Sequence, residues 1–436
     1  MRAKSNQPRA TTVHPSRPGT PWRAVLTTLL AILLFHGATR AEPSGTEDDI
    51  RLIRDLLGRA ETDSPAALAA RARQDAARER IPQARALPDP TIGYGWFLQR
   101  MNTRQIFRVE QPLPGFGKRE ARGGVAEEGA RASAEAAAAV GADIRLRLLE
   151  NLAEWVSARQ SRLLVEENIT LVGKLEQVAL RRYRTGESSQ ADVLRLQMEK
   201  ETLEVERQAW REREPVALAA IQSLLGRADG EPLTAPAALP LPSFDPETRL
   251  AESAGTADNP DLRRTQSLVR QAERGRDLAR REARPDFGIG VEYMDNRGHA
   301  QDEVMAMVTV RIPLWPSRYR GLRREASANL RAARQDHEGT ARALESGVSR
   351  ARHELLDARR RVSLYENALL PRARQSLSLL ESDYRTGRSG FLDLLEAQRT
   401  LLELELSLTR ARADYFTRLA WWERLTGQTL LLENES

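Results

Sequence analysis

The tetrapeptide Tyr183-Arg184-Thr185-Gly186 returns unchanged as Tyr384-Arg385-Thr386-Gly387, a displacement of 201 positions from residue 183 to residue 384. Other identical pairs share this displacement: Asp192 and Asp393, Leu194 and Leu395, Gln197 and Gln398, Leu224 and Leu425, Gly226 and Gly427, and Pro112 and Pro313. A solenoid repeat has a period of about 20–50 residues, so each copy here must hold several secondary-structure elements. The chain is therefore a tandem duplication.

A long helix is predicted before each repeated turn. Residues 118–182 contain no proline, and residues 320–383 contain only Pro371. Both stretches are rich in Ala, Arg, Leu and Glu, which favour helix. At about 1.5 Å per residue, such a helix is on the order of 100 Å long, far longer than a globular domain requires.

Shorter helices are predicted to pack against the long ones. They cover residues 48–86, 190–225, 260–283 and 391–426, with breaks at Asp63-Ser64-Pro65 and Asn259-Pro260. The glycine of each repeated turn is expected to end the long helix. Ser188, Ser189 and Ser389 are candidate N-caps for the returning helices. The result is a pair of antiparallel helical hairpins.

Each copy also contains a predicted β-hairpin. The strands are expected at about residues 90–98, 105–113, 286–294 and 304–313. Apolar residues alternate on one face: Ile92, Tyr94, Trp96 and Leu98 in the first copy, and Phe287, Ile289, Val291 and Tyr293 in the second. Arg108, Glu110, Thr309 and Arg311 lie opposite apolar neighbours. The alternation predicts strands with one apolar and one polar face.

An isolated hairpin is marginally stable in water, and four strands cannot close a barrel around a lumen. Strands of about nine to eleven residues with an apolar outer face are typical of a transmembrane β-barrel. The predicted fold class is therefore mainly α with a β-barrel part, closed by strands from several chains. A small soluble sheet packed on the helices is the alternative.

The amino terminus has the pattern of a secretory signal. Residues 1–41 combine six basic residues and no acid with an apolar run of about a dozen residues, which is too short to span a membrane. Without this segment the formal charge of +6 falls to zero. No segment after Ala41 is expected to gather Lys or Arg without interleaved acids, so neither nucleic acid nor a polybasic membrane contact is predicted. The lack of cysteine argues against a lipid-modified amino-terminal cysteine.

The order of these segments resembles that of the outer-membrane efflux channel family, the TolC-like proteins. The resemblance covers residues 42–427 and includes Leu87-Pro88-Asp89-Pro90, the Tyr-x-x-Gly turns, the Asp-x-Leu helices and a proline-rich crossover. The stretch Gln-Pro-Leu-Pro-Gly-Phe-Gly-Lys at residues 111–118 is similar to a junction in members that serve metal-exporting pumps. The resemblance implies a homotrimer with a twelve-stranded barrel in outer-membrane lipid and a helical tunnel across the periplasm. The channel would take substrate passively from an inner-membrane pump through a periplasmic adaptor.

The resemblance also implies two sites at the repeated turns. The tips would contact the adaptor through Thr185, Gly186, Glu187, Ser188, Thr386, Gly387, Arg388 and Ser389. The periplasmic gate would comprise Tyr384, Asp393, Glu396, Asp192 and Arg388. Asp393 and Glu396 are three positions apart and so share a helical face, where three-fold symmetry would bring six carboxylates together. A role for Asp192 and Asp393 as helix caps is the alternative.

The resulting organisation has a signal peptide at 1–41, a first repeat at 42–226, a crossover at 227–259, a second repeat at 260–427 and a tail at 428–436. No cofactor, metal site or catalytic residue is predicted. The mature histidines lack metal-ligand spacing, and Gly115-Phe116-Gly117-Lys118 is followed by Arg119 where a phosphate-binding loop needs Ser or Thr. Met101, Met294, Met305 and Met307 could offer thioethers to Cu(I), but methionine more often fills space.

Two other classes of protein are considered. A periplasmic adaptor or coiled-coil scaffold would share the helical hairpin, but it would carry one hairpin and more strands. A periplasmic enzyme would need a nucleophile, an acid–base pair or a metal cluster, and no such group is recognised. The sequence leaves open the exported substrate, the identity of the pump and adaptor, and the resting state of the tip.

Overall fold

The computed structural model describes residues 47–98, 103–186, 188–228, 232–242, 255–296, 301–386 and 388–431. All of them belong to one compact unit, Ser44–Ser436. Several predictions lie outside these residues: the signal peptide 1–41, Met101, Glu187, His299, Gly387, much of the crossover and most of the tail. The features below concern the described residues of this unit alone.

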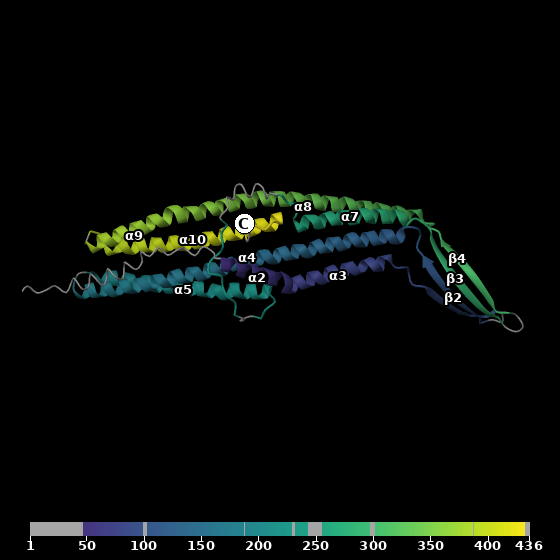
Figure 1. Cartoon of the computed structure of the whole chain (residues 1–436), viewed down its shortest axis with the longest axis horizontal. Helices are drawn as coiled ribbons and strands as arrows, with labels where there is room; N and C mark the ends of the chain where they lie inside the picture. The colour runs from purple at the N-terminus through teal and green to yellow at the C-terminus, as the bar shows by residue number, and fades with distance from the viewer. Residues whose placement is uncertain are drawn as a thin grey trace, which may run out of the picture. The chain divides into compact units, whose positions relative to one another are not determined.

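The duplication appears as two similar series of elements (Figure 1). The first copy contains α2 (Glu47–Asp63), α3 (Pro65–Arg85), β1 (Thr91–Trp96), β2 (Thr103–Leu113), α4 (Lys118–Arg184) and α5 (Gln190–Leu224). The second contains α7 (Pro260–Arg281), β3 (Asp286–Asn296), β4 (Glu303–Arg311), α8 (Pro316–Leu364), η2 (Tyr365–Leu369), α9 (Leu370–Arg385) and α10 (Phe391–Thr426). The predicted mainly helical fold with four strands is confirmed.

Local chemistry explains where the short helices begin. Pro65 occupies the first turn of α3, directly after the break at Ser64. The side chain of Asn259 caps α7, because its Oδ1 accepts hydrogen bonds from the backbone nitrogens of Asp261 at 2.9 Å and Leu262 at 3.3 Å. The asparagine side chain accepts hydrogen bonds from free N–H groups of the first helical turn, and a proline there has no N–H that would need a partner.

The α4–α5 hairpin packs with a seven-residue period. Its core includes Ala158, Val165, Val172 and Ala179 from α4, and Leu196, Leu203 and Trp210 from α5, joined by Leu395 and Leu402 from α10. A strict seven-residue repeat of apolar residues is typical of a left-handed coiled coil. The hairpin is thus held by a seam of side chains that also contacts the second copy.

A larger core joins the two copies near the middle of the helices. Leu148 and Leu152 of α4 and Tyr415, Phe416 and Trp422 of α10 are almost completely buried there. Residues of α2, α5 and α8 also belong to the cluster. Among the residues that the structure describes, no helix has an apolar stretch long enough to cross a membrane.

The second long helix contains a π-helical turn, η2, which is not among the predicted features. Pro371 follows two residues after this turn. Proline has no N–H to donate, and its ring clashes with the carbonyl four residues before it, so a wider turn accommodates it. Arg412 of α10 donates to Glu366 of η2 at 2.8 Å.

The four strands form one antiparallel sheet in the order β1-β2-β3-β4. The copies meet where β2 pairs with β3, with Phe107 opposite Tyr293. β1 ends at Trp96 and β4 at Arg311, each two residues short of the predicted end. β4 stops before Pro313, which cannot donate to a strand ladder. β2 begins at Thr103 and β3 ends at Asn296, each two residues beyond the predicted limit.

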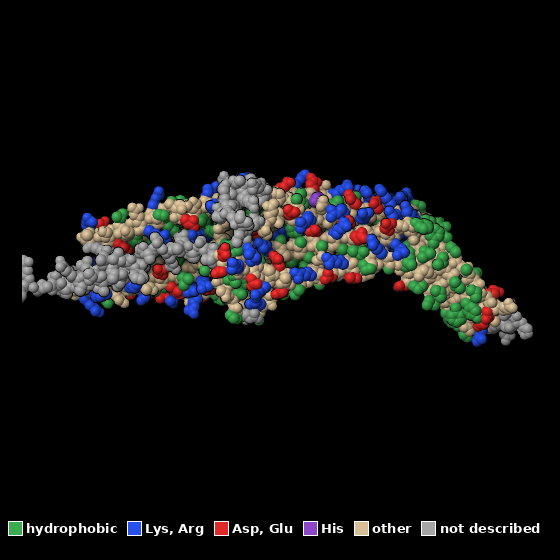
Figure 2. Space-filling view, viewed as in Figure 1, with side chains coloured by type: hydrophobic (Ala, Val, Ile, Leu, Met, Phe, Trp, Pro, Cys, Tyr) green, Lys and Arg blue, Asp and Glu red, His purple; other side chains and the backbone are tan. Residues whose placement is uncertain are grey.

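One face of the sheet is apolar and open. Ile92, Val304 and Val308 are each more than 70% exposed, and the pairing places them on the same face as Phe107 and Val291. Figure 2 shows hydrophobic side chains spread over the sheet. A sheet packed on the helices of its own chain is therefore wrong as an alternative, because the helices leave this face uncovered.

The opposite face of the sheet is polar and closely packed. Arg108 donates to Glu292 at 2.7 Å, and Thr309 donates to Glu110 at 2.8 Å. A Cβ added to Gly288 would lie 2.3 Å from the Thr309 hydroxyl oxygen. Glycine therefore lets the polar groups of neighbouring strands approach one another on this face.

The Gly427→Ala variant is expected to destabilise the fold much more than Gly186→Ala. Both glycines have positive φ, 78° and 76°, which costs a non-glycine residue about 1 kcal/mol or more. A Cβ at Gly427 would also lie 2.7 Å from the Asp258 carbonyl oxygen, whereas nothing lies within 4 Å of a Cβ at Gly186. Relief of that clash requires backbone movement, so we expect a total loss of about 3 kcal/mol. Apparent unfolding temperatures in the same detergent measure the difference, and equal shifts would contradict this account.

Candidate functional site

The two repeated turns lie at the end of the helices away from the sheet (Figure 1). Thr185 donates its hydroxyl hydrogen to the Arg182 carbonyl at 3.0 Å, and Thr386 donates likewise to the Asp383 carbonyl at 3.0 Å. Gly186 has a φ of 76° and ends the first turn. The repeated threonine therefore closes the last turn of the long helix in both copies.

The returning helix α5 begins with a capping box. Asp192 donates its backbone N–H to the Ser189 hydroxyl at 3.2 Å, and Ser189 donates its own N–H to the Asp192 carboxylate at 3.3 Å. The Ser188 hydroxyl also donates to that carboxylate at 3.2 Å. Partial burial raises the pKa of Asp192, but these serine hydrogen bonds and Arg195 outweigh it and hold the pKa below its usual value.

The second turn restarts differently. The N-cap of α10 is Gly390, whose backbone N–H donates to the Asp393 carboxylate at 3.0 Å. Ser389 instead donates its hydroxyl hydrogen to the Leu380 carbonyl at 3.3 Å. Of the three predicted serine caps only Ser189 is confirmed. At the displacement of 201 residues Ser389 corresponds to Ser188, and the capping position of Ser189 is Gly390 in the second copy.

Tyr384 connects the two copies at the tip. Arg182 of α4 donates to the Tyr384 hydroxyl and places its guanidinium carbon 4.8 Å from the centre of the tyrosine ring. The ring of Phe391 packs edge-on, with centroids 6.1 Å apart. Burial is the main cause that raises the pKa of Tyr384, Arg182 opposes it, and the charge of Asp192 adds to it. Tyr384 and Asp192, both predicted gate residues, therefore share one cluster.

Arg182 is not among the residues predicted from the sequence, although the sequence holds a signal for it. Arg182 stands one position before the repeated tetrapeptide, where the second copy has Asp383. A basic residue in one copy and an acid in the other is the sort of difference expected where two copies take different roles. The pairing itself depends on the approach of α4 and α9, which no local pattern encodes.

The other predicted gate residues occupy separate places. Asp393 and Glu396 are exposed on α10, and in the described chain no hydrogen bond or ion pair joins either to Tyr384 or Asp192. Glu199 raises the pKa of Arg399 by accepting its hydrogen bond, and Glu396 adds to that effect. Arg388 forms a 2.9 Å ion pair with Asp383. Asp393 therefore caps α10, and neither it nor Glu396 belongs to the Tyr384 cluster.

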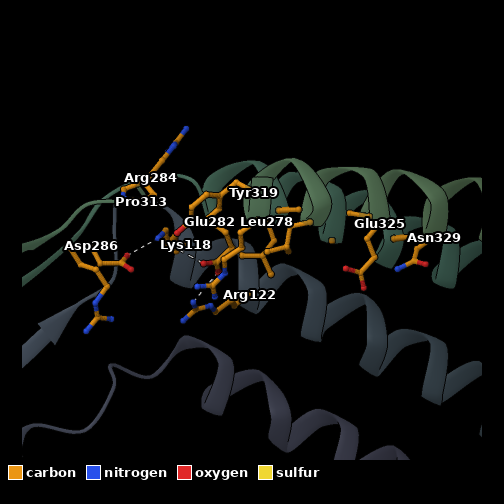
Figure 3. Close-up of a pocket in the computed structure, with 17 residues that line it drawn as sticks. Lys118, Arg122, Leu278, Glu282, Arg284, Asp286, Pro313, Tyr319, Glu325 and Asn329 are labelled. Atoms are coloured by element: carbon orange, nitrogen blue, oxygen red, sulfur yellow. Dashed lines mark hydrogen bonds and ion pairs between the residues drawn. The ribbon is translucent and has the colours of Figure 1, made fainter. Parts of the chain in front are cut away.

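A second polar centre lies where the sheet meets the helices. Figure 3 shows Lys118 of α4 reaching Asp286 at the start of β3, while Arg122 reaches Glu282. The Lys118 side chain is 2% exposed, and its Nζ lies 2.8 Å from Asp286 and 3.8 Å from Glu282. The Gly115 backbone N–H also donates to Asp286, at 2.7 Å. The adjoining pocket has a volume of about 630 Å³ and is lined from α4, α7, α8 and the sheet.

Each of these two polar centres connects separate parts of the fold. The tip cluster, Arg182 and Tyr384, links the two hairpins. The junction cluster, Lys118, Glu282 and Asp286, links the sheet to the helices. No group of three or more His, Asp or Glu side chains that could hold a metal ion occurs in the ranges that the structure describes.

A duplicated pair of long helical hairpins that carries an open four-stranded sheet defines the class of outer-membrane efflux channels. The chain belongs to the family described as "Outer membrane efflux protein", whose model matches residues 56–227 and 254–428. It is an exit duct of an efflux system.

The chain is similar to one curated protein in sequence and to two solved structures in fold. The cobalt-zinc-cadmium resistance protein CzcC of Cupriavidus metallidurans is 25% identical over 363 residues, covering 81% of this chain and 84% of CzcC. The crystal structure of VceC from Vibrio cholerae is 18% identical, covers 86% of this chain and 96% of VceC, and has a TM-score of 0.69. The open-state structure of the Neisseria gonorrhoeae MtrE channel is 16% identical, covers 86% of this chain and 89% of MtrE, and has a TM-score of 0.69.

Proposed function

We propose that three copies of this chain form the outer-membrane duct of a tripartite efflux system and conduct substrate passively. The open sheet is the observation that carries this proposal. β1 and β4 are its two edges, and within the described chain neither has a second partner. Pairing β4 of one copy with β1 of the next would join twelve strands from three copies and remove every exposed edge.

The dimensions of the apolar face support placement in a membrane. The longest strands, β2 and β3, each have eleven residues and cover about 33 Å at 3.3 Å per residue. Tilted by about 40°, that length corresponds to an apolar band of about 25 Å, as in transmembrane barrels. Exposed aromatic side chains mark both ends: Tyr94, Trp96 and Tyr293 toward the loops, and Phe116, Phe287 and Trp315 toward the helices. Such residues favour the lipid–water boundary.

The turns are proposed to receive the periplasmic adaptor, which connects the duct to an inner-membrane pump. The contact residues would be Thr185, Gly186, Glu187, Ser188, Thr386, Gly387, Arg388 and Ser389. The gate would lie beside them, with Arg182 and Tyr384 holding the two hairpins together near Asp192. Asp393 and Glu396 of three copies would form a ring of six carboxylates, and Arg388 would border it.

The remaining parts of the proposal concern export and cargo. Residues 1–41 would direct export and be cleaved, and the barrel would hold the protein in the outer membrane without a cysteine-linked lipid. The proposed repeats, 42–226 and 260–427, would supply the duct, with the crossover 227–259 around its middle and the tail at 428–436. The likeness to CzcC favours metal ions as cargo, and no catalytic step is required.

Single-channel recording in planar bilayers tests this function. The purified mature chain is expected to give discrete conductance, and Asp393→Ala with Glu396→Ala is expected to change its size or cation selectivity about twofold or more, since rings of acids select cations. Asp75→Ala with Glu79→Ala, which removes the same charge from α3, serves as the control and should change little. Absence of conductance in every protein would overturn the channel. An unchanged conductance in the gate variant alone would remove Asp393 and Glu396 from the constriction.

A further inference from the structure

The start of α8 carries an unusual cluster of arginines. From Arg311 to Arg324 the sequence has five arginines and no acid. The expectation that no segment after Ala41 gathers Lys or Arg without interleaved acids is therefore wrong. The four on the helix, Arg318, Arg320, Arg323 and Arg324, are named the collar arginines here, and all four are exposed.

Within the described residues, the collar arginines lack the carboxylate partners that several later arginines of α8 have. Arg334, Arg342 and Arg361, further along the helix, each pair with a carboxylate. In the described part of the chain no carboxylate lies within ion-pair distance of any collar arginine. Of the nearby acids, Asp286 and Glu282 are already engaged by Lys118 and Arg122, and Glu325, which directly follows Arg324, is one acid beside four arginines. The collar therefore has positive charge left for a partner outside the chain.

The position of the collar identifies the chemistry of that partner. Leu314 and Trp315 are 70% and 72% exposed and immediately precede α8, where the apolar face of the sheet ends. The ring of Phe116 packs on Phe287 with centroids 6.1 Å apart and is itself 84% exposed. Figure 2 shows Lys and Arg side chains gathered over the helices next to this apolar face. The positively charged collar therefore begins directly beyond the exposed aromatic residues Phe116 and Trp315.

A second feature strengthens the local positive field. Over residues 116–122, 281–286 and 311–325 the chain has ten basic and four acidic residues. Arg284 points away from the Lys118 cluster in Figure 3, and its guanidinium donates to the Phe116 carbonyl at 2.9 Å. An arginine is thereby fixed beside the exposed aromatic ring. Guanidinium groups match the geometry of phosphate oxygens.

We propose that the collar arginines bind the phosphates of anionic phospholipids in the leaflet nearest the helices. The inference rests on the proposed placement of the sheet in a membrane. The phosphates of a lipid layer lie just outside its hydrocarbon. The collar arginines would lie at the same depth, because they follow Trp315 at the end of the apolar face. Basic residues near such a surface attract anionic lipid, each by about fivefold at modest ionic strength.

The test counts lipids retained by the whole protein. The mature chain is reconstituted in vesicles of phosphatidylcholine and phosphatidylglycerol at about three to one, extracted gently and analysed by native mass spectrometry. We expect about tenfold enrichment of phosphatidylglycerol over its share of the vesicle. In a quadruple collar variant the enrichment should fall by at least about threefold; its substitutions are R318Q, R320Q, R323Q and R324Q. A control variant replaces four exposed arginines further along the chain and should keep the enrichment; its substitutions are R331Q, R350Q, R352Q and R372Q.

The outcomes separate this inference from the proposed function. Equal enrichment in all three proteins, or none in the wild type, overturns the collar as a phospholipid site while conductance still supports the duct. Failure to insert or conduct overturns the proposed function itself. Unchanged helix content by circular dichroism shows that a collar variant has folded, and conductance shows that it has assembled. A loss of enrichment in such a variant then supports the inference.

Discussion

Lys118→Ala is expected to lower the stability of the chain by about 3 kcal/mol, because removing one partner of a buried ion pair leaves the other uncompensated. Lys118 is almost fully buried, while Asp286 and Glu282 keep about a quarter of their side-chain surface exposed. Water can therefore partly solvate the two carboxylates after Lys118 is removed. We accordingly expect a loss of stability at the lower end of the range for a broken buried ion pair. Apparent unfolding temperature in a fixed detergent measures the effect.

Two further variants separate the charge from the volume of Lys118. Lys118→Met keeps the stem and removes the charge, so most of the loss should remain. Adding Asp286→Asn to Lys118→Met should recover part of it, since the unpaired carboxylate is then absent. Lys174→Met, an exposed lysine of the same helix, should be nearly neutral. If Lys118→Met and Lys174→Met are equally mild, the junction ion pair does not hold the sheet to the helices.

Arg182→Gln combined with Tyr384→Phe is expected to raise single-channel conductance several-fold. The two substitutions remove one hydrogen bond and the cation–π contact between α4 and α9, which join the two hairpins at the tip. Such contacts contribute about 1–2 kcal/mol each when partly desolvated. A loss of that size shifts a closed–open equilibrium by about tenfold or more. Planar-bilayer recording of the mature chain gives the open probability and conductance directly.

The duplication provides the matched control for the gate experiment. Tyr183 stands at the position in the first copy that Tyr384 occupies in the second, and it is 43% exposed. Tyr183→Phe should therefore leave conductance unchanged. A similar increase in both variants would show that loosening either turn opens the tip, and the Arg182–Tyr384 contact would lose its special role.

Much of the fold follows from local sequence. The repeated tetrapeptide, the Asn259-Pro260 start and the alternation in the strands predict the elements and their order, because capping, proline geometry and strand pleating act over a few residues. The seven-residue spacing of Ala158, Val165, Val172 and Ala179 was also readable and would have predicted the coiled-coil seam.

Features that depend on contacts between distant segments were not predictable in this way. The β2–β3 pairing brings Phe107 to Tyr293, and the packing of α4 near α9 brings Arg182 to Tyr384. Neither pair has a local signature, since each depends on how two separately formed hairpins pack. The capping serine at Ser389 failed for a simpler reason: the second copy has Gly390 at the capping position, and the glycine backbone replaces the side-chain cap.

The π-helical turn has a consequence for symmetry. The displacement of 201 residues holds both before the turn, between Pro112 and Pro313, and after it, between Tyr183 and Tyr384. The two long arms therefore have equal residue counts but different winding, because only the second contains η2. Equal arms would give three copies a near six-fold arrangement in which every hairpin must behave alike. In the proposed trimer, unequal winding reduces that arrangement to three alternating pairs, so the two hairpins of one copy need not behave alike.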